Sequence, residues 1–185
     1  MGRAVGAYFW DRLLMAKYSV LVCSPYLSPK NVEKLVDLAK RDVKVLVITS
    51  LPKQPGENPQ HEEAIAILQK AIEPERDWLG RPKKDWKKPN LDVKYADERF
   101  IHAKIYCVDG ELAIVGSANF TERGLWESIE YVLIFEGDDA MKIEADFEKL
   151  WILYATEGVK KGEAFTPEAA ASLLKGLLSK LPFKR

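Results

Sequence analysis

The sequence IHAKIYCVDGELAIVGSANFT, residues 101–121, decides the fold of the central part of the chain. Two apolar runs flank Asp109-Gly110, a dipeptide that favours a two-residue turn between antiparallel strands. We therefore expect strands over 100–108 and 112–116, joined as a hairpin. Alternate residues of the first strand are apolar and are expected to point into a core.

The opposite face of this hairpin carries four polar side chains. Alternation places His102 and Lys104 on the same face of the first strand. A two-residue turn sets Ser117 opposite His102, and Asn119 continues the same face. The spacing therefore gathers an imidazole, an ammonium, a hydroxyl and a carboxamide into one patch.

This set of groups suits a phosphate diester. Lys104 supplies a positive charge for the phosphoryl oxygens, and Ser117 and Asn119 supply neutral donors. His102 is able to act as a nucleophile or general acid near neutral pH. Glu130 lies in the otherwise apolar run SIEYVLIF, where a carboxylate needs a partner, and a ring N–H of His102 is the natural one. A His beside a Lys on a strand is usually a solvated surface, but the additional Ser, Asn and Glu favour a site.

A longer pattern runs through the same stretch without a gap or substitution. It reads H-x-K-x4-D-x6-G-S-x-N and consists of His102, Lys104, Asp109, Gly116, Ser117 and Asn119. This pattern resembles the signature of the phospholipase D superfamily, and Glu130 stands where that family carries a further conserved acid. The resemblance covers most of the chain, from the first strand–helix–strand unit through a helix near 154.

The resemblance implies a two-step hydrolysis that uses no metal and no other cofactor. One histidine attacks phosphorus to form a covalent phosphohistidine, and a second histidine protonates the leaving alkoxide and then activates water. Lys104 and Asn119 would hold the phosphoryl oxygens, and Glu130 would orient His102. Asp109 and Gly116 are expected to have structural roles, Asp109 by fixing the turn and its neighbours.

The long members of this family contain two copies of the motif, whereas this chain contains one. His61, the only other histidine, lies in the sequence HEEA with no lysine two residues later. The resemblance to short single-motif members therefore implies a C2 homodimer in which two chains build one active site.

The rest of the chain predicts an α/β fold. A strand over 18–23, a helix starting at Ser28-Pro29 and a strand over 43–49 form a βαβ unit with parallel strands. Further helices are expected over 2–17, 60–72 and 138–154, and further strands over 91–95 and 128–135. These elements predict a mixed sheet with helices on both faces, in a catalytic domain over 1–160. Residues 161–185 are expected to form a helical extension, with a helix over about 167–181.

Composition places few limits on function. The 185 residues fit one domain, and 28 Lys plus Arg balance 28 Asp plus Glu, so nucleic-acid binding would depend on local charge. Cys23 and Cys107 lie in apolar runs, which argues against a disulfide scaffold or a zinc site. The N-terminal region is too charged for a signal peptide, and no stretch approaches the roughly 20 apolar residues of a membrane span. We therefore expect a cytoplasmic protein without integral membrane association.

One basic segment is a candidate for substrate binding. Its cations, which surround Trp86 with only Asp85 opposing them, are Arg81, Lys83, Lys84, Lys87 and Lys88. Such a cluster is suited to gripping a phosphate backbone and stacking a base, although a solvated basic loop has the same composition. Trp78 and Trp126 either line the entrance of the same site or belong to the core. The position of Trp126 between the motif and Glu130 favours the site.

Short single-motif members of the family are mostly similar to endonucleases, so we expect a nuclease. The alternative is a phospholipase D or phosphatidyl transferase, for which the leucine-rich C-terminal helix would provide a membrane-facing surface. A non-catalytic nucleic-acid-binding module is a third possibility, which the intact motif disfavours.

Overall fold

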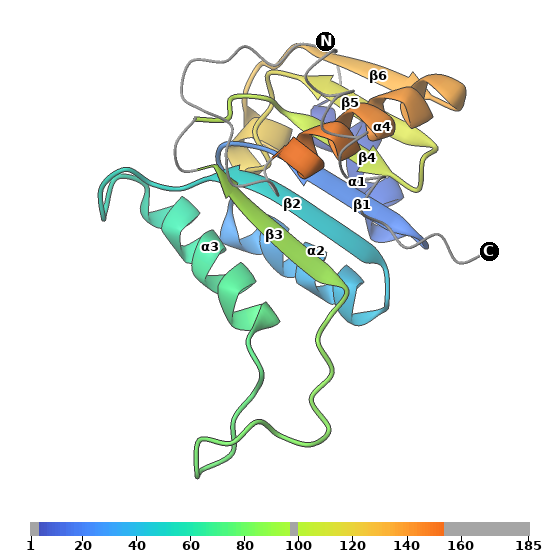
Figure 1. Cartoon of the computed structure of the whole chain (residues 1–185). Helices are drawn as coiled ribbons and strands as arrows, with labels where there is room; N and C mark the ends of the chain where they lie inside the picture. The colour runs from blue at the N-terminus through green and yellow to red at the C-terminus, as the bar shows by residue number, and fades with distance from the viewer. Residues whose placement is uncertain (1–3, 97–99, 154–185) are drawn as a thin grey trace, which may run out of the picture.

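The computed structural model describes residues 4–96 and 100–153, and its centre is a six-stranded sheet with the order β3-β2-β1-β4-β5-β6 (Figure 1). The strands are β1 (Ser19–Cys23), β2 (Lys44–Ser50), β3 (Leu91–Ala96), β4 (Ile105–Val108), β5 (Leu112–Gly116) and β6 (Val132–Glu136). The helices are α1 (Val5–Leu14), α2 (Pro29–Lys40), α3 (Pro59–Ile72), the π-helical turn η1 (Arg123–Glu127) and α4 (Asp138–Leu153). The helical extension expected over 161–185 lies outside the described residues.

The strand directions bring several strand ends to one edge of the sheet. β1, β2 and β3 run parallel, whereas β4, β5 and β6 run antiparallel to their neighbours. The segment β1–α2–β2 is therefore the expected βαβ unit, and the predicted mixed α/β sheet is confirmed. Cys23 at the end of β1 pairs with Ile105 at the start of β4. We call this edge, where β1, β2, β3 and β5 end and β4 and β6 begin, the site edge.

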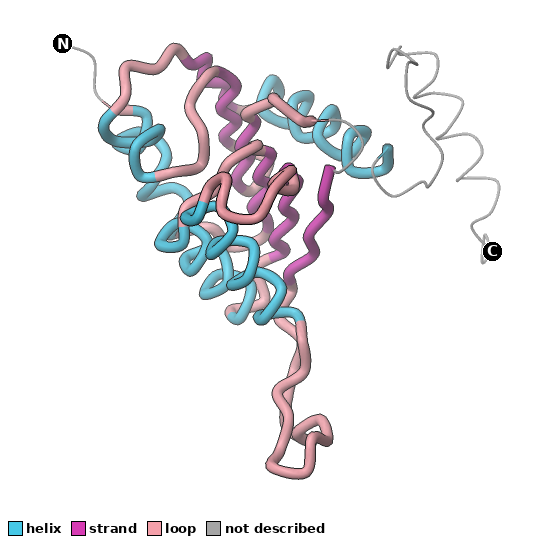
Figure 2. The backbone as a smooth tube through the Cα atoms, turned by 90° about the vertical axis from the view of Figure 1, so that its left-hand side faces the viewer, coloured by secondary structure: helices cyan, strands magenta, loops and turns pink. Residues whose placement is uncertain are grey.

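Helices cover both faces of the sheet, as the sequence predicted (Figure 2). Helices α1, α2 and α3 pack on the face that carries Val20 and Val45. Helix α4 packs on the other face, where Phe147 joins the cluster that contains Leu21. Fully burying one such side chain contributes about 1.5–3 kcal/mol, so these two clusters hold the layers together. Within the described residues, no helix combines the length and the apolar character that a membrane crossing requires.

The β4–β5 hairpin differs from its expected register by one residue. Asp109 and Gly110 have φ angles of 54° and 68°, in the left-handed region that an Asp-Gly turn uses. Val108 nevertheless pairs with Leu112 rather than with Glu111, so the loop has three residues. A shift of one residue turns side chains to the other face of a sheet. The expected pairing of Ser117 with His102 is therefore wrong.

The Asp109 carboxylate ties this hairpin to the start of β1. It accepts hydrogen bonds from the backbone N–H groups of Lys17 (2.9 Å), Tyr18 (2.8 Å) and Ser19 (2.8 Å). The N–H of Asp109 donates in return to the carbonyl oxygen of Ser19 at 2.9 Å. These contacts lie at the edge of the sheet opposite the site edge, so Asp109 stabilises the fold at a distance from His102.

We expect Asp109→Ala to lower the free energy of unfolding by roughly 1–3 kcal/mol, because three main-chain N–H groups lose a charged acceptor. Asp109→Asn should lose less, since it keeps one acceptor oxygen and tolerates a positive φ. Glu111→Ala is the matched control, because the Glu111 side chain makes no hydrogen bond to the described residues. Denaturant titrations followed by circular dichroism compare the variants. An unchanged midpoint for Asp109→Ala would contradict the structural role of this carboxylate.

Candidate active site

The candidate catalytic residues lie in the segments that precede or follow strands at the site edge. His102 and Lys104 precede β4, Ser117 and Asn119 follow β5, and Glu130 precedes β6. The antiparallel pairing of β4 with β5, and of β5 with β6, brings these three segments together. The sheet topology thus assembles a site from residues that are distant in sequence.

His102 lies in a segment that no strand pairing holds, because β4 starts at Ile105, later than expected. Side chains anchor this segment instead. The hydroxyl of Ser50, at the end of β2, lies 3.3 Å from the backbone nitrogen and 3.3 Å from the carbonyl oxygen of Ile101. The His102 side chain itself is exposed. The imidazole of His102 is therefore accessible, while the backbone next to it is fixed by the contact between Ser50 and Ile101.

Lys104 is buried beneath the same segment, at 5% exposure. Its Nζ donates a hydrogen bond of 2.8 Å to the carbonyl oxygen of His102. Burial lowers the pKa of Lys104, while Glu130 and Cys23 act in the opposite direction. The ammonium thus has a fixed place beside the backbone of His102 and within electrostatic reach of Glu130.

Glu130 is hydrogen-bonded to Ser117, and not to His102 as the sequence suggested. The Ser117 hydroxyl donates to Oε2 of Glu130 and accepts from the N–H of Tyr131 at 3.0 Å. The pairing of Gly116 with Val132 accounts for this contact, because it places Ser117 beside the segment that precedes β6. β6 itself starts only at Val132, so Glu130 lies in the approach to the strand rather than within it.

Gly116 allows this approach of Ser117 to Glu130. A Cβ atom at position 116 would lie 2.3 Å from the carbonyl oxygen of Tyr131 and 2.7 Å from Cα of Val132. Both are backbone atoms, so a side chain here would push β6 away from β5. The glycine of the motif is therefore required by the close contact between the two strands.

Asn119 is held by a second glycine that the sequence analysis missed. A Cβ at Gly124 would lie 2.5 Å from the carbonyl oxygen and 2.8 Å from the nitrogen of Asn119. The N–H of Gly124 also donates to Thr121 Oγ1 at 2.9 Å, which closes the start of η1. Oδ1 of Asn119 is buried without a hydrogen-bond partner among the described residues. Its carboxamide is thus positioned but not saturated by protein contacts.

Two further residues shape the loop that carries Ser117 and Asn119. The hydroxyl of Ser24 accepts from the N–H of Phe120 at 3.0 Å, and the buried Tyr106 hydroxyl donates to the carbonyl oxygen of Ala118. Burial raises the pKa of Tyr106, which keeps the phenol protonated as a donor. Tyr106 follows Lys104 by two residues, and this spacing was the signal in the sequence that could have indicated a place beneath the site.

His61 is a buried structural histidine at 1% exposure. Its Nδ1 accepts from the N–H of Leu27 at 3.2 Å, so Nε2 carries the proton and donates to the carbonyl oxygen of Ser50 at 2.8 Å. Burial lowers the pKa of this imidazole and favours its neutral form. Both ring nitrogens are occupied by backbone groups, which agrees with the conclusion that HEEA is not a second motif.

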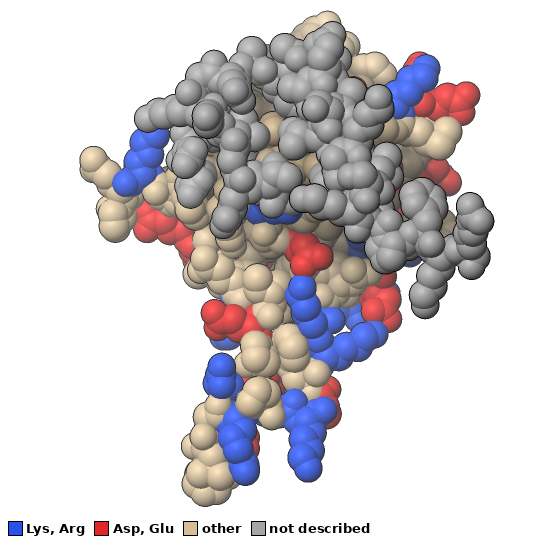
Figure 3. Space-filling view, in the orientation of Figure 1, with Lys and Arg blue, Asp and Glu red and all other residues tan. Residues whose placement is uncertain are grey.

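The structure does not bring the basic segment to His102. The segment leads into β3 at Leu91, at the opposite edge, and a strand of six residues spans about 17 Å before it reaches the site edge. Figure 3 shows Lys and Arg side chains on this protruding part with Asp and Glu beside them. Its ion pairs are Lys83–Glu75 (2.8 Å), Lys87–Asp42 (2.9 Å) and Lys88–Asp92 (2.7 Å). These contacts favour the alternative of a solvated, charge-compensated loop.

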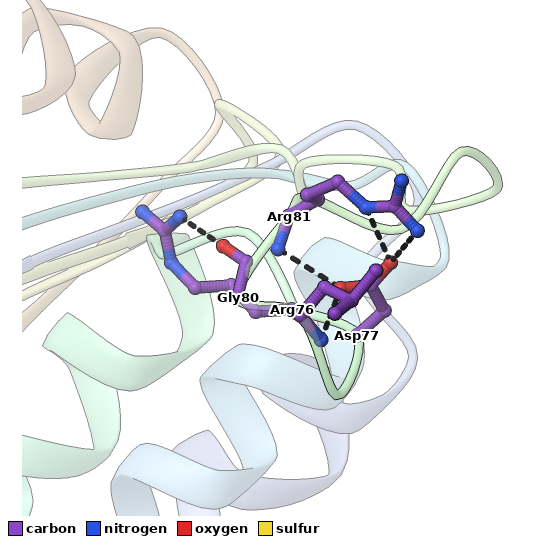
Figure 4. A network of polar contacts seen from close by, with 5 residues as sticks. Arg76, Asp77, Gly80 and Arg81 are labelled. Carbon is purple, nitrogen blue, oxygen red and sulfur yellow. Dashed lines mark hydrogen bonds and ion pairs between the residues drawn. The ribbon is translucent and has the colours of Figure 1, made fainter.

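The tip of the protruding loop is organised by Asp77 (Figure 4). Its carboxylate accepts from the backbone N–H and from Nε of Arg81, both at 3.0 Å, and Arg76 donates to the carbonyl oxygen of Gly80 at 2.8 Å. Trp86 lies at the base, where it lines a groove of about 1060 Å³ with side chains of α2 and α3. Trp86 therefore faces a groove beside the helical layer and not the site edge.

The expectation that Trp78 and Trp126 line the entrance of one site is wrong. Trp78 belongs to the protruding loop and is 89% exposed. Trp126 packs on α1, where its indole ring lies so close to Gly6 that a Cβ there would be 2.5 Å away. The rings of Trp126 and Trp10 are 6.3 Å apart in an edge-to-face contact. Trp126 thus fixes η1 to α1, and its position between two site residues in the sequence was misleading.

The chain matches the family model described as "Cardiolipin synthase, PLD-like domain" over residues 9–151. It therefore belongs to the phospholipase D superfamily through this PLD-like domain. A cardiolipin synthase from Geobacillus is 26% identical over 144 residues, which are 75% of this chain and 25% of that protein. The chain thus spans about a quarter of the length of this relative.

Solved structures share the fold at low sequence identity. NucT from Helicobacter pylori has a TM-score of 0.53 and 18% identity, over 76% of this chain and 83% of that chain. Nuc from Salmonella typhimurium, a phospholipase D family member, has a TM-score of 0.56 and 19% identity, over 78% and 85%. Phosphatidylserine synthase from Haemophilus influenzae has a TM-score of 0.54 and 18% identity, over 96% of this chain and 44% of that chain. At these identities the likeness concerns the fold alone.

Proposed function

We propose that the protein is a metal-independent phosphodiesterase that hydrolyses nucleic-acid phosphodiester bonds. The observation that carries this proposal is the exposed imidazole of His102 together with the buried ammonium of Lys104, whose Nζ donates a hydrogen bond to the carbonyl oxygen of His102. A nucleophile next to a fixed positive charge suits the attack on an anionic phosphate. Family membership supports the same chemistry.

In the first step a ring nitrogen of His102 attacks phosphorus. The N–P bond forms as the bond from phosphorus to the leaving oxygen breaks, and a second imidazolium gives that oxygen its proton. Lys104 and Asn119 stabilise the negative charge on the remaining phosphoryl oxygens. Glu130 offsets the charge of Lys104 and fixes the Ser117 hydroxyl. It therefore does not orient the His102 ring of its own chain, the role that was expected from the sequence.

In the second step water attacks phosphorus and the N–P bond breaks. The second imidazole, now neutral, takes the proton from the water and returns to its starting state. One chain has one motif histidine, so the second imidazole is His102 of another copy in a C2 homodimer. The supporting feature is an exposed apolar row beside Glu130, formed by Ile129, Tyr131 and Leu133 at 103%, 77% and 49% exposure. Such a row beside a site is suited to being covered by a second copy.

Nucleic acid is the preferred substrate class because the single motif of this chain resembles that of the short members of the family, which are mostly similar to endonucleases. The folds of NucT and Nuc match this chain over 76% and 78% of its length. The basic segment that carries Lys83, Lys84, Trp86, Lys87 and Lys88 is not included in the proposed site, because it lies at the opposite edge of the sheet.

The second candidate is a phosphodiesterase or phosphatidyl transferase that acts on lipids. The cardiolipin synthase relative and the name of the matching family model favour it. The exposed apolar row beside Glu130 would then contact a lipid surface instead of a second copy.

A substrate panel in EDTA separates these functions. We expect hydrolysis of fluorescent single-stranded DNA, double-stranded DNA or RNA without added metal, and no release of choline from phosphatidylcholine vesicles. His102→Ala should abolish turnover, because it removes the nucleophile. Glu57→Ala, in the exposed turn before α3, should leave turnover unchanged. Loss of activity in EDTA with recovery in Mg²⁺, Mn²⁺ or Zn²⁺ would contradict the histidine route, and hydrolysis of the lipid alone would favour the second candidate.

A subunit-mixing experiment tests the shared site. With equal amounts of wild type and His102→Ala, full exchange leaves about one quarter of dimers with two intact chains. A site that needs both histidines should then retain about one quarter of the wild-type activity per total protein. Independent sites would retain about one half. A mass tag on one partner must show the exchange separately, because unexchanged dimers also retain about one half.

A further inference from the structure

A row of aromatic rings leads from the interior to His102. The ring centroids of His61 and Tyr26 are 5.7 Å apart, those of Tyr26 and Phe100 are 6.0 Å apart, and those of Phe100 and His102 are 5.8 Å apart. Exposure increases along this row, from 1% at His61 to 47% at Phe100. None of these contacts was expected from the sequence.

The inner end of this row is rigid. Both nitrogens of His61 are bonded to backbone groups, at Leu27 and Ser50. The carbonyl oxygen of Tyr26 accepts from the Ser24 hydroxyl at 2.8 Å, which fixes the turn that carries the tyrosine. Ser50 holds the backbone next to Phe100 through its contacts with Ile101. Phe100 is therefore a half-exposed aromatic side chain next to an anchored residue, Ile101.

The position of Phe100 beside His102 is suited to contact with a substrate base. It is adjacent to the imidazole that attacks phosphorus, with its ring plane at 31° to that of His102. In a nucleic acid a single sugar separates each base from its phosphate, so a phosphate at His102 brings a base into the neighbourhood of Phe100. Stacking on an aromatic side chain accepts any base, because every base has a π-face.

We propose that Phe100, supported by Tyr26, is a stacking subsite for the base next to the scissile phosphate. This inference rests on the proposed function, and it adds a sequence-independent contact that the catalytic motif does not provide. The subsite contributes binding of the nucleotide flanking the reacting bond, while the chemistry remains with His102. It predicts a preference for substrates that carry a base at this position over substrates that carry only the sugar and phosphate.

Two oligonucleotides test the subsite. Both are single-stranded thymidine chains with one hydrolysable phosphodiester among methylphosphonate linkages, and in the second the two sugars flanking that bond lack their bases. Phe100→Leu keeps an apolar side chain beside His102 but removes the π-face, and Phe100→Tyr keeps the ring. Tyr18→Ala is the matched control, an aromatic side chain that is 73% exposed at the opposite edge of the sheet.

We expect Phe100→Leu to lower kcat/KM on the base-bearing chain by roughly 5- to 150-fold, the effect of one lost stacking contact. The same variant should leave the rate on the abasic chain unchanged, and Phe100→Tyr and Tyr18→Ala should resemble the wild type on both. Equal losses on both chains would mean that Phe100 only supports His102 and would overturn the subsite. A wild type that cleaves neither chain and none of the nucleic acids in the substrate panel would refute the proposed substrate class, and the subsite with it; a wild type that cleaves other nucleic acids but neither chain would refute the subsite. A wild type that cleaves both chains equally well would refute the subsite alone.

Discussion

The buried ammonium of Lys104 is the constraint around which the site edge is built. A charge with 5% exposure is costly unless other groups compensate it. The carbonyl oxygen of His102 accepts from it at 2.8 Å, and the carboxylate of Glu130 lies within electrostatic reach. The compensation of this one charge therefore links the segment of the nucleophile to the segment before β6.

The neighbouring contacts depend on this arrangement. Glu130 accepts from Ser117, and Ser117 can reach it because Gly116 lets β5 and β6 approach closely. Gly124 likewise allows a close approach to the backbone of Asn119. The amide oxygen of Asn119 has no partner among the described residues. A phosphate that binds here would meet an accessible imidazole, a fixed positive charge and the N–H donors of the Asn119 carboxamide. Charge-assisted and neutral hydrogen bonds of this kind act most strongly where water is limited.

The sequence predicted most of the fold, because its signals are local. The βαβ unit follows from two apolar runs and a proline-started helix, and the Asp-Gly turn from the φ angles that these residues tolerate. The register was missed by one residue, since the Asp-Gly dipeptide alone does not fix the length of the loop. The partner of Glu130 is Ser117 rather than His102, and the pairing of β5 with β6 places these two residues side by side.

The sequence could not predict which residues that are distant along the chain lie close together in the fold. The basic segment lies at the opposite edge from His102, because β3 separates them. Three of its lysines pair with acidic residues, and one of these partners, Asp42, is distant in sequence. Trp126 packs on α1, a contact made possible only by Gly6, more than a hundred positions earlier. The anchoring of Ile101 by Ser50 likewise joins residues that carry no common local pattern.

The stereochemical course at phosphorus tests the central claim, that the histidine replaces water as the attacking group. A phosphorothioate diester of known configuration, drawn from the class that the protein cleaves, is hydrolysed in isotopically labelled water. Two successive in-line displacements, first by His102 and then by water, predict retention of configuration. Inversion would mean a single direct attack by water and would contradict the covalent phosphohistidine.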